Sequence, residues 1–241
     1  MSRLEPARLP WKILDLVRGE FLLLVTLGLA CGLGWGFLEL ADEVDEGETE
    51  WFDTTVLAWF RAPGNVDQMA GPPWLHEVGR DITALGSYTV LLIFVFGVVG
   101  SFLLRRKAGA AIVILASVAG GALLSSLLKI GYGRSRPELE SAAEHFTNSF
   151  PSGHATLSAV TYLTIGALMA RLSEDRILGG FYLGFAMCLT LLVGISRLYL
   201  GVHFPSDVVA GWALGAGWAL FCSGVALLLQ RMNRLRDKSS S

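Results

Sequence analysis

Residues 108–128 read AGAAIVILASVAGGALLSSLL, a run of apolar and small residues without a single Asp, Glu, Lys or Arg. About 20 such residues are needed for an α-helix to cross the hydrocarbon core of a bilayer. The whole chain has 241 residues, of which 53% are apolar, and its mean hydropathy is +0.53, more than soluble domains usually show. The run therefore predicts a transmembrane helix that ends at Lys129.

Five further runs also lack charged residues, and each is about the length of a membrane span. They occupy 21–38, 82–104, 155–170, 177–196 and 208–230. The fourth span, 155–170, is the weakest because it is short and contains several Thr and Ser residues. Without it, the basic loops on either side would face opposite sides of the membrane. We expect an all-α, polytopic membrane bundle of six transmembrane helices that forms a single integral domain over 1–241.

The distribution of basic residues predicts the orientation of this bundle, because loops rich in Lys and Arg stay in the cytoplasm. Thirteen of the nineteen Lys and Arg residues lie in the N-terminal segment, in the turns at 105–107 and 171–176, or in the C-terminal tail. The segment 39–81, in contrast, carries eleven acidic residues. We therefore expect a multi-pass protein of the cell (inner) membrane, with residues 1–20 and 231–241 in the cytoplasm and 39–81 as an outer, periplasmic loop.

Three features each allow two interpretations. The first run, 21–38, is interpreted as an anchor because it is long for the core of a cleavable signal peptide, which is the alternative. In the outer loop, the apolar residues of 51–60 recur at helical spacing, which indicates a short helix either lying on the membrane surface or packed over the other spans. Gly211, Gly215 and Gly217 favour close helix packing, although they could also shape a groove for a lipid chain.

Lys129 and Arg136 form the first of three polar segments that fall on the same outer side. Gly131-Tyr132-Gly133 between them should break the helix, so that the two cations can approach one point from different directions. A compact ammonium group and a planar guanidinium both suit phosphate oxygens. Cations at a helix end also commonly lie among lipid headgroups, so this segment alone leaves both interpretations open.

Pro151-Ser152-Gly153-His154 forms the second segment and has the pattern of a helix start. Ser152 is a candidate N-cap, and Gly153 permits close approach of the backbone to a ligand. Backbone N–H groups at a helix start favour an anion, and His154 beside them could protonate a departing oxygen. A lone histidine at a membrane interface is, however, often incidental.

Arg197, His203 and Asp207 form the third segment, just before the last span. Because Asp207 follows His203 by four residues, its carboxylate can accept a hydrogen bond from one ring nitrogen and fix the tautomer. The other nitrogen is then free to attack phosphorus. Pro205 suits the first turn of the following helix. The alternative is a His–Asp pair with a purely structural hydrogen bond.

Together, the three segments resemble the signature of the type 2 phosphatidic acid phosphatase superfamily. That signature reads Lys, six residues, Arg-Pro; then Pro-Ser-Gly-His; then Ser-Arg, five residues, His, three residues, Asp. This chain matches every position between Lys129 and Asp207, a stretch of about 80 residues. The six-span layout extends the resemblance over most of the chain and is similar to that of the integral lipid phosphatases of the family.

The resemblance implies a role for each matched residue. His203 would attack phosphorus to give a phosphohistidine, Asp207 would orient it, His154 would protonate the leaving group, and water would hydrolyse the intermediate. The groups implied to bind the phosphate are Lys129, Arg136, Ser152, the Gly153 amide and Arg197. No metal or other cofactor is expected, because three cations offset a phosphate charge of about −1.5 to −2.

A lipid whose tail stays in the bilayer while its headgroup enters the site is the expected substrate. By resemblance, the candidates are undecaprenyl diphosphate, phosphatidylglycerophosphate, phosphatidic acid and diacylglycerol diphosphate, and analogy favours the first. The other expected partners are membrane lipids and no nucleic acid, while the sequence leaves the oligomeric state open. The alternatives are a lipid phosphotransferase and a non-catalytic phospholipid-binding or transport protein. Vanadate-dependent haloperoxidases share the signature but are not expected to have six spans.

Overall fold

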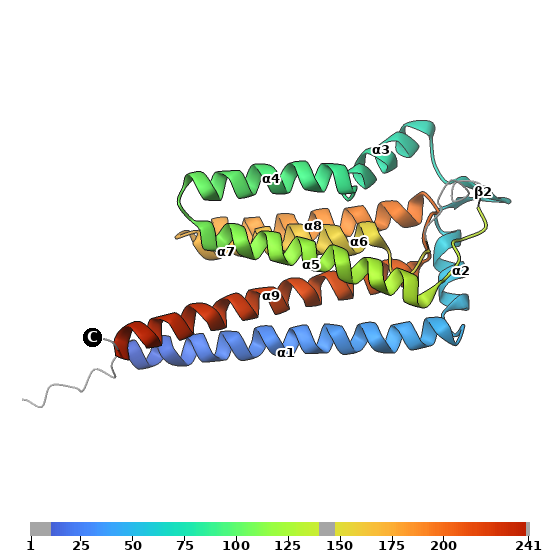
Figure 1. Ribbon diagram of the computed structural model, residues 1–241. Coiled ribbons are helices and arrows are strands. Elements are labelled where there is room, and N and C mark those ends of the chain that lie inside the picture. Colours follow the sequence, from blue (N-terminus) through green and yellow to red (C-terminus); the bar gives the residue numbers. More distant parts are fainter. Residues whose placement is uncertain (1–10, 140–147, 240–241) are drawn as a thin grey trace, which may run out of the picture.

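The computed structural model describes the backbone of residues 11–139 and 148–239 and the side chains of 20–139 and 148–232. Most of its helices run side by side in an elongated bundle, and one short helix, α2, lies across an end of that bundle (Figure 1). In chain order the elements are α1 (Trp11–Asp45), α2 (Glu50–Ala58), β1 (Arg61–Ala62), β2 (Asn65–Met69), α3 (Pro73–Ala84), α4 (Tyr88–Leu104), α5 (Ala108–Tyr132), α6 (Gly153–Ser158), the π-helical turn η2 (Ala159–Leu163), α7 (Thr164–Leu172), α8 (Arg176–Tyr199) and α9 (Pro205–Ser239).

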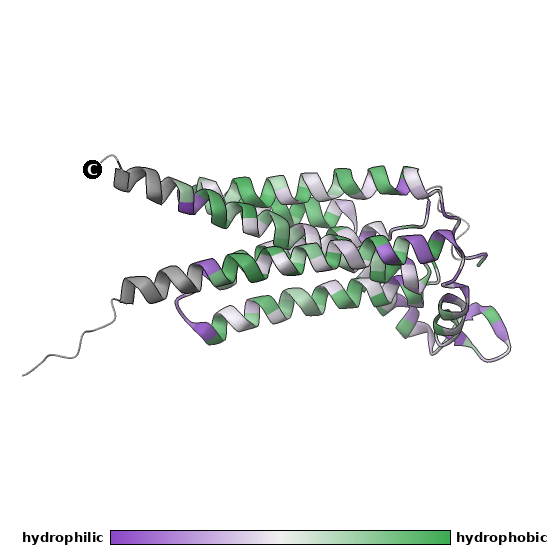
Figure 2. Cartoon of the chain, turned by 90° about the horizontal axis from the view of Figure 1, so that it is seen from below, coloured by the Kyte–Doolittle hydropathy of each residue, from purple (hydrophilic) through white to green (hydrophobic). Residues whose placement is uncertain are grey.

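The prediction of an all-helical membrane bundle is confirmed. Within the described residues, five helices are long and apolar enough to cross a membrane, and the bent pair α3 and α4 makes a sixth if it is one span. The five are Glu20–Asp45, Ala108–Tyr132, Gly153–Leu172, Arg176–Tyr199 and Pro205–Met232. Figure 2 shows hydrophobic residues along the helices and hydrophilic residues mainly near the two ends of the bundle.

The predicted second span, 82–104, is wrong in its first part. The chain bends by 50° between α3 and α4, so residues 82–84 belong to α3 and the apolar helix starts only at Tyr88. The Ser87 hydroxyl caps α4 by accepting a hydrogen bond from the Val90 N–H. At the bend, a Cβ on Gly86 would lie 2.4 Å from Val193 Cγ1, so this turn packs closely against α8. Because residues 82–104 contain no charged residue, hydropathy alone did not reveal the break.

The predicted fourth span, 155–170, is the most buried of the candidate spans. It corresponds to α6, η2 and α7, and 61% of its apolar window is buried, against 28% or less for the other four. Its short polar side chains bond within the bundle: the Thr156 hydroxyl donates to the Ser152 carbonyl at 2.9 Å, and the Thr164 and Ser117 hydroxyls lie 2.9 Å apart. Thr and Ser therefore occur here because the helix is surrounded by protein rather than by lipid.

The segment predicted as an outer loop, 39–81, is largely ordered structure. It begins inside α1 and ends inside α3, and it contains α2 and the unpredicted hairpin of β1 and β2. Helix α2 buries Asp53 and Leu57 against the bundle end and leaves Trp51 and Trp59 exposed. The helix is therefore packed over the bundle end through one face, whereas contact of its other face with the membrane surface stays a prediction.

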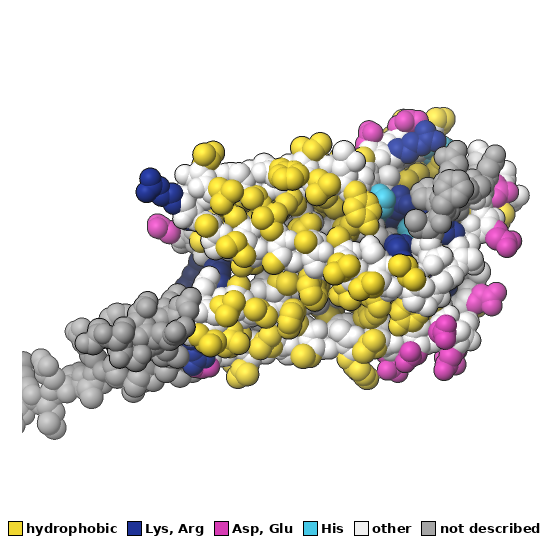
Figure 3. Space-filling model, in the orientation of Figure 1, with side chains coloured by type: hydrophobic (Ala, Val, Ile, Leu, Met, Phe, Trp, Pro, Cys, Tyr) yellow, Lys and Arg dark blue, Asp and Glu magenta, His cyan; other side chains and the backbone are white. Residues whose placement is uncertain are grey.

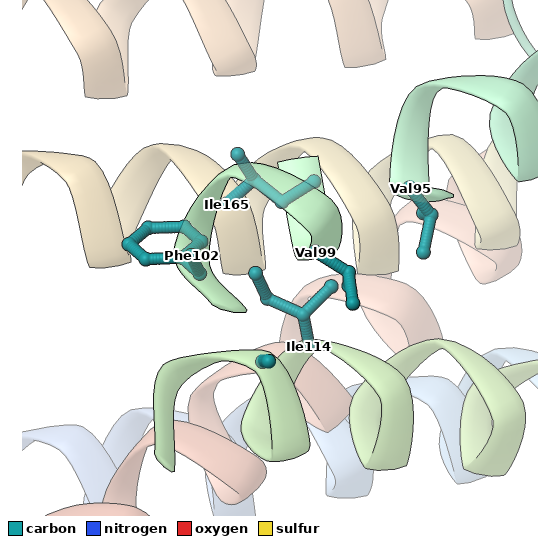
Figure 4. Packing of buried hydrophobic residues seen from close by; sticks show 6 residues of the cluster. Val95, Val99, Phe102, Ile114 and Ile165 are labelled. Carbon is teal, nitrogen blue, oxygen red and sulfur yellow. The ribbon is translucent and has the colours of Figure 1, made fainter. Parts of the chain in front are cut away.

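At the opposite end of the bundle, the core between α4, α5 and α7 is apolar. Val95, Val99 and Phe102 of α4 pack with Ile114 of α5 and Ile165 of α7 (Figure 4). The described start of α1 and the end of α9 also lie at this end (Figure 1). That this end faces the cytoplasm stays a prediction.

Glycines on α9 allow it to pack directly on the backbone of α6. A Cβ on Gly211 would lie 2.9 Å from the Ser152 carbonyl oxygen, and one on Gly215 would lie 2.5 Å from the Thr156 carbonyl oxygen. Small residues at both positions therefore bring the starts of the two helices together, as expected from the sequence.

We expect the substitution Gly215→Ala to destabilise the fold by about 1–3 kcal/mol, because the new methyl group would press on backbone that cannot yield cheaply. Thermal unfolding of the detergent-solubilised protein measures the effect. Gly100→Ala is the matched control, since nothing lies within 4 Å of a Cβ at that position. Equal melting temperatures for the two variants would contradict the close packing of α6 and α9.

Candidate active site

The buried carboxylate of Asp207, on the first turn of α9, joins the segments of the site. Its Oδ1 accepts a hydrogen bond from Arg134 Nη1 at 2.7 Å. Its Oδ2 accepts hydrogen bonds from the Ser149 hydroxyl and, at 2.8 Å, from the Phe204 N–H. The Asp207 carbonyl oxygen accepts from the Ser152 N–H at 2.9 Å. Three loops that are distant in the sequence are thereby held at one point.

His203 lies in the α8–α9 turn, is fully buried, and presents its two ring nitrogens to different neighbours. Nδ1 is 3.4 Å from Asp207 Oδ2 and 3.1 Å from Ser149 Oγ, whereas Nε2 is 3.3 Å from Arg136 Nη1. Because Ser149 donates to Asp207, its oxygen can accept a hydrogen from Nδ1. This arrangement favours the tautomer with a proton on Nδ1 and a lone pair on Nε2.

Burial is the largest influence on the protonation of His203. It lowers the pKa of the imidazole well below its usual value; the hydrogen bond to Asp207 opposes this shift, and the charges of Arg197 and Arg136 add to it. A lowered pKa means that the ring stays neutral to a lower pH. A neutral imidazole keeps the lone pair that a nucleophile needs.

Lys129 and Arg136 reach the site from the two sides of the helix break that was predicted at Gly131-Tyr132-Gly133, although the helix continues past its predicted end at Lys129. Helix α5 ends at Tyr132, and Gly133 follows with a left-handed φ of 63°. Lys129 Nζ donates to the Asn148 carbonyl at 2.7 Å, and Arg136 Nη1 donates to the Val202 carbonyl at 2.7 Å. Backbone oxygens thus help to hold both cations in place.

Arg197 and Ser152 hold buried polar atoms that lack hydrogen-bond partners among the described residues. Arg197 Nη1 donates to Thr83 Oγ1 at 3.0 Å, but Nε and Nη2 of Arg197 and Oγ of Ser152 have no such partner. Ser152 occupies the N-cap position of α6 as predicted, but its side chain makes no capping bond. Each unpaired buried donor costs about 1–3 kcal/mol, so an oxyanion bound nearby would satisfy groups that the fold leaves unsatisfied.

A cavity of about 430 Å³ opens between these groups. Its lining residues are Tyr88, Ser126, Lys129, Ile130, Arg136, Asn148, Gly153, His154, Arg197 and His203. Six of the eight residues singled out from the sequence are in this set, while Ser152 and Asp207 are not. In Figure 3, histidine and basic side chains lie beside the hydrophobic body of the molecule, near the end that carries most of the acidic side chains.

Arg134 and Ser149 lie against Asp207 but were not predicted as site residues from the sequence. Arg134 lies two residues before Arg136, and Ser149 lies two residues before Pro151. Their closeness to these motifs in the sequence could have suggested a role in the site. Neither residue belongs to the matched signature. Tyr88, Ser126 and Asn148 of the cavity wall were missed as well, because nothing in their own segments distinguishes them.

Comparisons with known proteins identify the family of this chain. Residues 110–231 match the model of the PAP2 superfamily. Phosphatidylglycerophosphatase B of Bacillus subtilis is 34% identical over 147 residues, which cover 59% of this chain and 71% of that protein. A lipid A 1-phosphatase of Rhizobium johnstonii is 31% identical over 185 residues, which cover 67% of this chain and 71% of that protein.

A solved structure shares the fold. The crystal structure of a transmembrane PAP2-type phosphatidylglycerolphosphate phosphatase from Bacillus subtilis has a TM-score of 0.73 and 29% sequence identity, and the match covers 81% of this chain and 94% of that one. The chain is therefore a multi-pass membrane protein that belongs to the PAP2 superfamily, among its membrane lipid phosphatases.

Proposed function

We propose that this protein hydrolyses the terminal phosphate of a membrane lipid through a covalent phosphohistidine on His203. The observation that carries the proposal is the single cavity in which His203, His154 and three cations converge from separate segments. Turning Nδ1 of His203 towards Asp207 and Ser149 leaves Nε2 on the side of Arg136, another lining residue. A phosphate between the cations would meet this nitrogen.

In the proposed first step, the lone pair on Nε2 of His203 forms a bond to phosphorus while the bond from phosphorus to the lipid oxygen breaks. His154 gives its proton to the departing oxygen, so that a neutral alcohol, or a lipid monophosphate if the substrate is a diphosphate, leaves. Lys129, Arg136 and Arg197 stabilise the charge on the three equatorial oxygens.

In the proposed second step, water attacks the phosphohistidine. The bond from phosphorus to Nε2 breaks, and inorganic phosphate leaves. His154, now without its proton, accepts one from the attacking water and returns to its starting state. The proton on Nδ1 of His203 stays in place throughout, held between Ser149 and Asp207.

An apolar cavity beside the polar one supports a lipid substrate. It has a volume of about 180 Å³, lies between α4, α5 and the α6–η2 segment, and is walled mainly by Leu, Val, Ala and Phe side chains. Tyr88 lines both cavities. A lipid whose headgroup lies among the cations could therefore place its acyl or prenyl chain in this apolar cavity.

The relatives are named for one shared kind of substrate, a phosphate carried by a membrane lipid, and they differ in the lipid. We propose this shared class for the present chain, with phosphatidylglycerophosphate, phosphatidic acid and undecaprenyl diphosphate as the substrates to compare. From the charge distribution, we also propose that both termini are cytoplasmic and that the site opens on the outer, periplasmic side.

Phosphate release from this lipid panel, measured with purified protein in detergent and EDTA, tests the proposal. We expect release by the wild type and none by His203→Ala, because no other group can take the place of the nucleophile. A requirement for added divalent metal, or activity in His203→Ala, would overturn the mechanism. Binding without release would support the non-catalytic alternative, and transfer to an added lipid alcohol would support the phosphotransferase.

The role of His154 predicts a dependence on the leaving group. We expect His154→Ala to lower kcat/KM for a lipid phosphate by about 10² to 10⁴, because the alkoxide must then leave without a proton. This ratio covers only the steps up to departure of the leaving group, so it excludes the later hydrolysis step in which His154 also acts. With p-nitrophenyl phosphate, whose phenolate leaves unaided, the loss should be much smaller. Equal losses with both substrates would rule out proton donation by His154.

The lowered pKa of His203 predicts that its ring is neutral in mildly acidic solution. At pH 5.5 a histidine with the ordinary pKa of about 6.5 is mostly protonated, whereas His203 should keep a proton on Nδ1 alone. Nitrogen chemical shifts of ¹⁵N-histidine-labelled protein report this directly, with His203→Gln to assign the signal. An imidazolium signal from His203 at pH 5.5 would contradict the lowered pKa and the neutral ring.

A further inference from the structure

A second buried carboxylate lies behind the site and reaches Asp207 through Arg134. Arg134 Nη1 bonds Asp207 Oδ1 at 2.7 Å, and Arg134 Nη2 bonds Asp53 Oδ2 at 2.7 Å. The guanidinium also stacks over the Phe204 ring, 4.5 Å from its centroid. One planar fork thus bridges two carboxylates, a geometry that Lys could not reproduce.

Asp53 belongs to α2, which lies across the bundle end and outside residues 110–231, the part that matches the family model. Its side chain is 1% exposed. It accepts hydrogen bonds from the Ser206 N–H at 2.8 Å, the Ser206 hydroxyl at 2.6 Å and the Thr49 hydroxyl at 3.1 Å, in addition to the bond from Arg134. Because Ser206 precedes Asp207, Asp53 fixes the first turn of α9 from two directions.

The charges of this group matter for the attack by His203. Arg134 on its own would neutralise Asp207 and weaken its attraction for the imidazole. With Asp53 included, the three side chains carry a net charge of −1. The imidazole becomes positive as Nε2 bonds to phosphorus, and the remaining negative charge stabilises it in surroundings of low dielectric constant, where such interactions are strong.

We propose that Asp53 and Arg134 are positioning residues for the nucleophile. Arg134 holds Oδ1 of Asp207 so that Oδ2 faces Ser149 and His203, and Asp53 balances the charge of Arg134 so that Asp207 stays effectively anionic towards the ring. Neither Asp53 nor Arg134 lines the phosphate cavity, so both act on the reaction through Asp207. The inference rests on the proposed phosphohistidine at His203.

Three variants separate geometry from charge. Asp53→Asn leaves Arg134 uncompensated beside Asp207, and Arg134→Gln leaves two neighbouring buried carboxylates to repel each other. We expect each substitution to lower kcat by about 10- to 100-fold, because a displacement of the nucleophile by up to about 1 Å has an effect of this size. The double variant Asp53→Asn/Arg134→Gln restores the net charge of −1, so its kcat should exceed that of Arg134→Gln alone.

The readout must distinguish positioning from partial unfolding, which only lowers the amount of active enzyme. Vanadate can take five ligands and so resembles the phosphoryl transition state, whereas inorganic phosphate resembles a ground state. We expect the inhibition constant of vanadate to rise in parallel with the fall in kcat, while the KM and the inhibition constant of phosphate stay within about twofold. The KM and the two inhibition constants do not depend on how much of the protein is folded, whereas kcat does.

Arg80→Gln is the matched control, because Arg80 forms an exposed ion pair with Glu77 at 3.3 Å on α3. This control should keep the wild-type kcat and vanadate inhibition. Unchanged vanadate inhibition in both single variants would overturn the inference. So would a double variant in which the two losses of kcat simply add. In either case, an active wild type would still support the proposed function. A wild type that releases no phosphate from any lipid would overturn both.

Discussion

The fold of the site depends on the need to satisfy one buried charge. Asp207 is completely shielded from solvent, and an ionised carboxylate in such a place costs several kcal/mol unless it is paired and hydrogen-bonded. Its partners come from the segment after α5, the segment before α6 and the turn before α9. These segments must meet for Asp207 to be tolerated, and their meeting brings Lys129, Arg136, His154 and His203 to one cavity.

The membrane explains why this happens at a bundle end. Inside the hydrocarbon core the backbone has to stay helical, because no water is present to satisfy free N–H and C=O groups. The chain leaves the helix at Gly133, before Gly153 and after Tyr199, and each break occurs beside the cavity. Figure 2 shows the resulting division between an apolar body and hydrophilic ends. A site at such an end can receive a lipid headgroup while the tail remains among the helices.

Local signals in the sequence predicted much of this arrangement. Uncharged runs marked the candidate membrane spans, Gly131-Tyr132-Gly133 marked the end of α5 approximately, and Pro205 marked the start of α9. The bend at Gly86 was not predictable, since it depends on contact with Val193 across the bundle. Asp53 was equally hidden, because it follows a run of acidic residues that ends at Glu50, and only tertiary packing distinguishes a buried carboxylate from solvated ones. Periodicity and spacing report local structure, whereas the support of Asp207 is built from contacts between distant segments.

The central claim is that the phosphoryl group passes through a covalent bond to His203. The most direct measurement is to react the protein with a lipid carrying ³²P in its terminal phosphate, stop the reaction rapidly, and map the labelled peptide. The account predicts a label on the peptide that contains His203, stable in base and labile in acid as expected for a phosphoramidate, and removed by chasing with unlabelled substrate. Turnover in one step, with no label on the protein at any time, or a label on another residue, would contradict it.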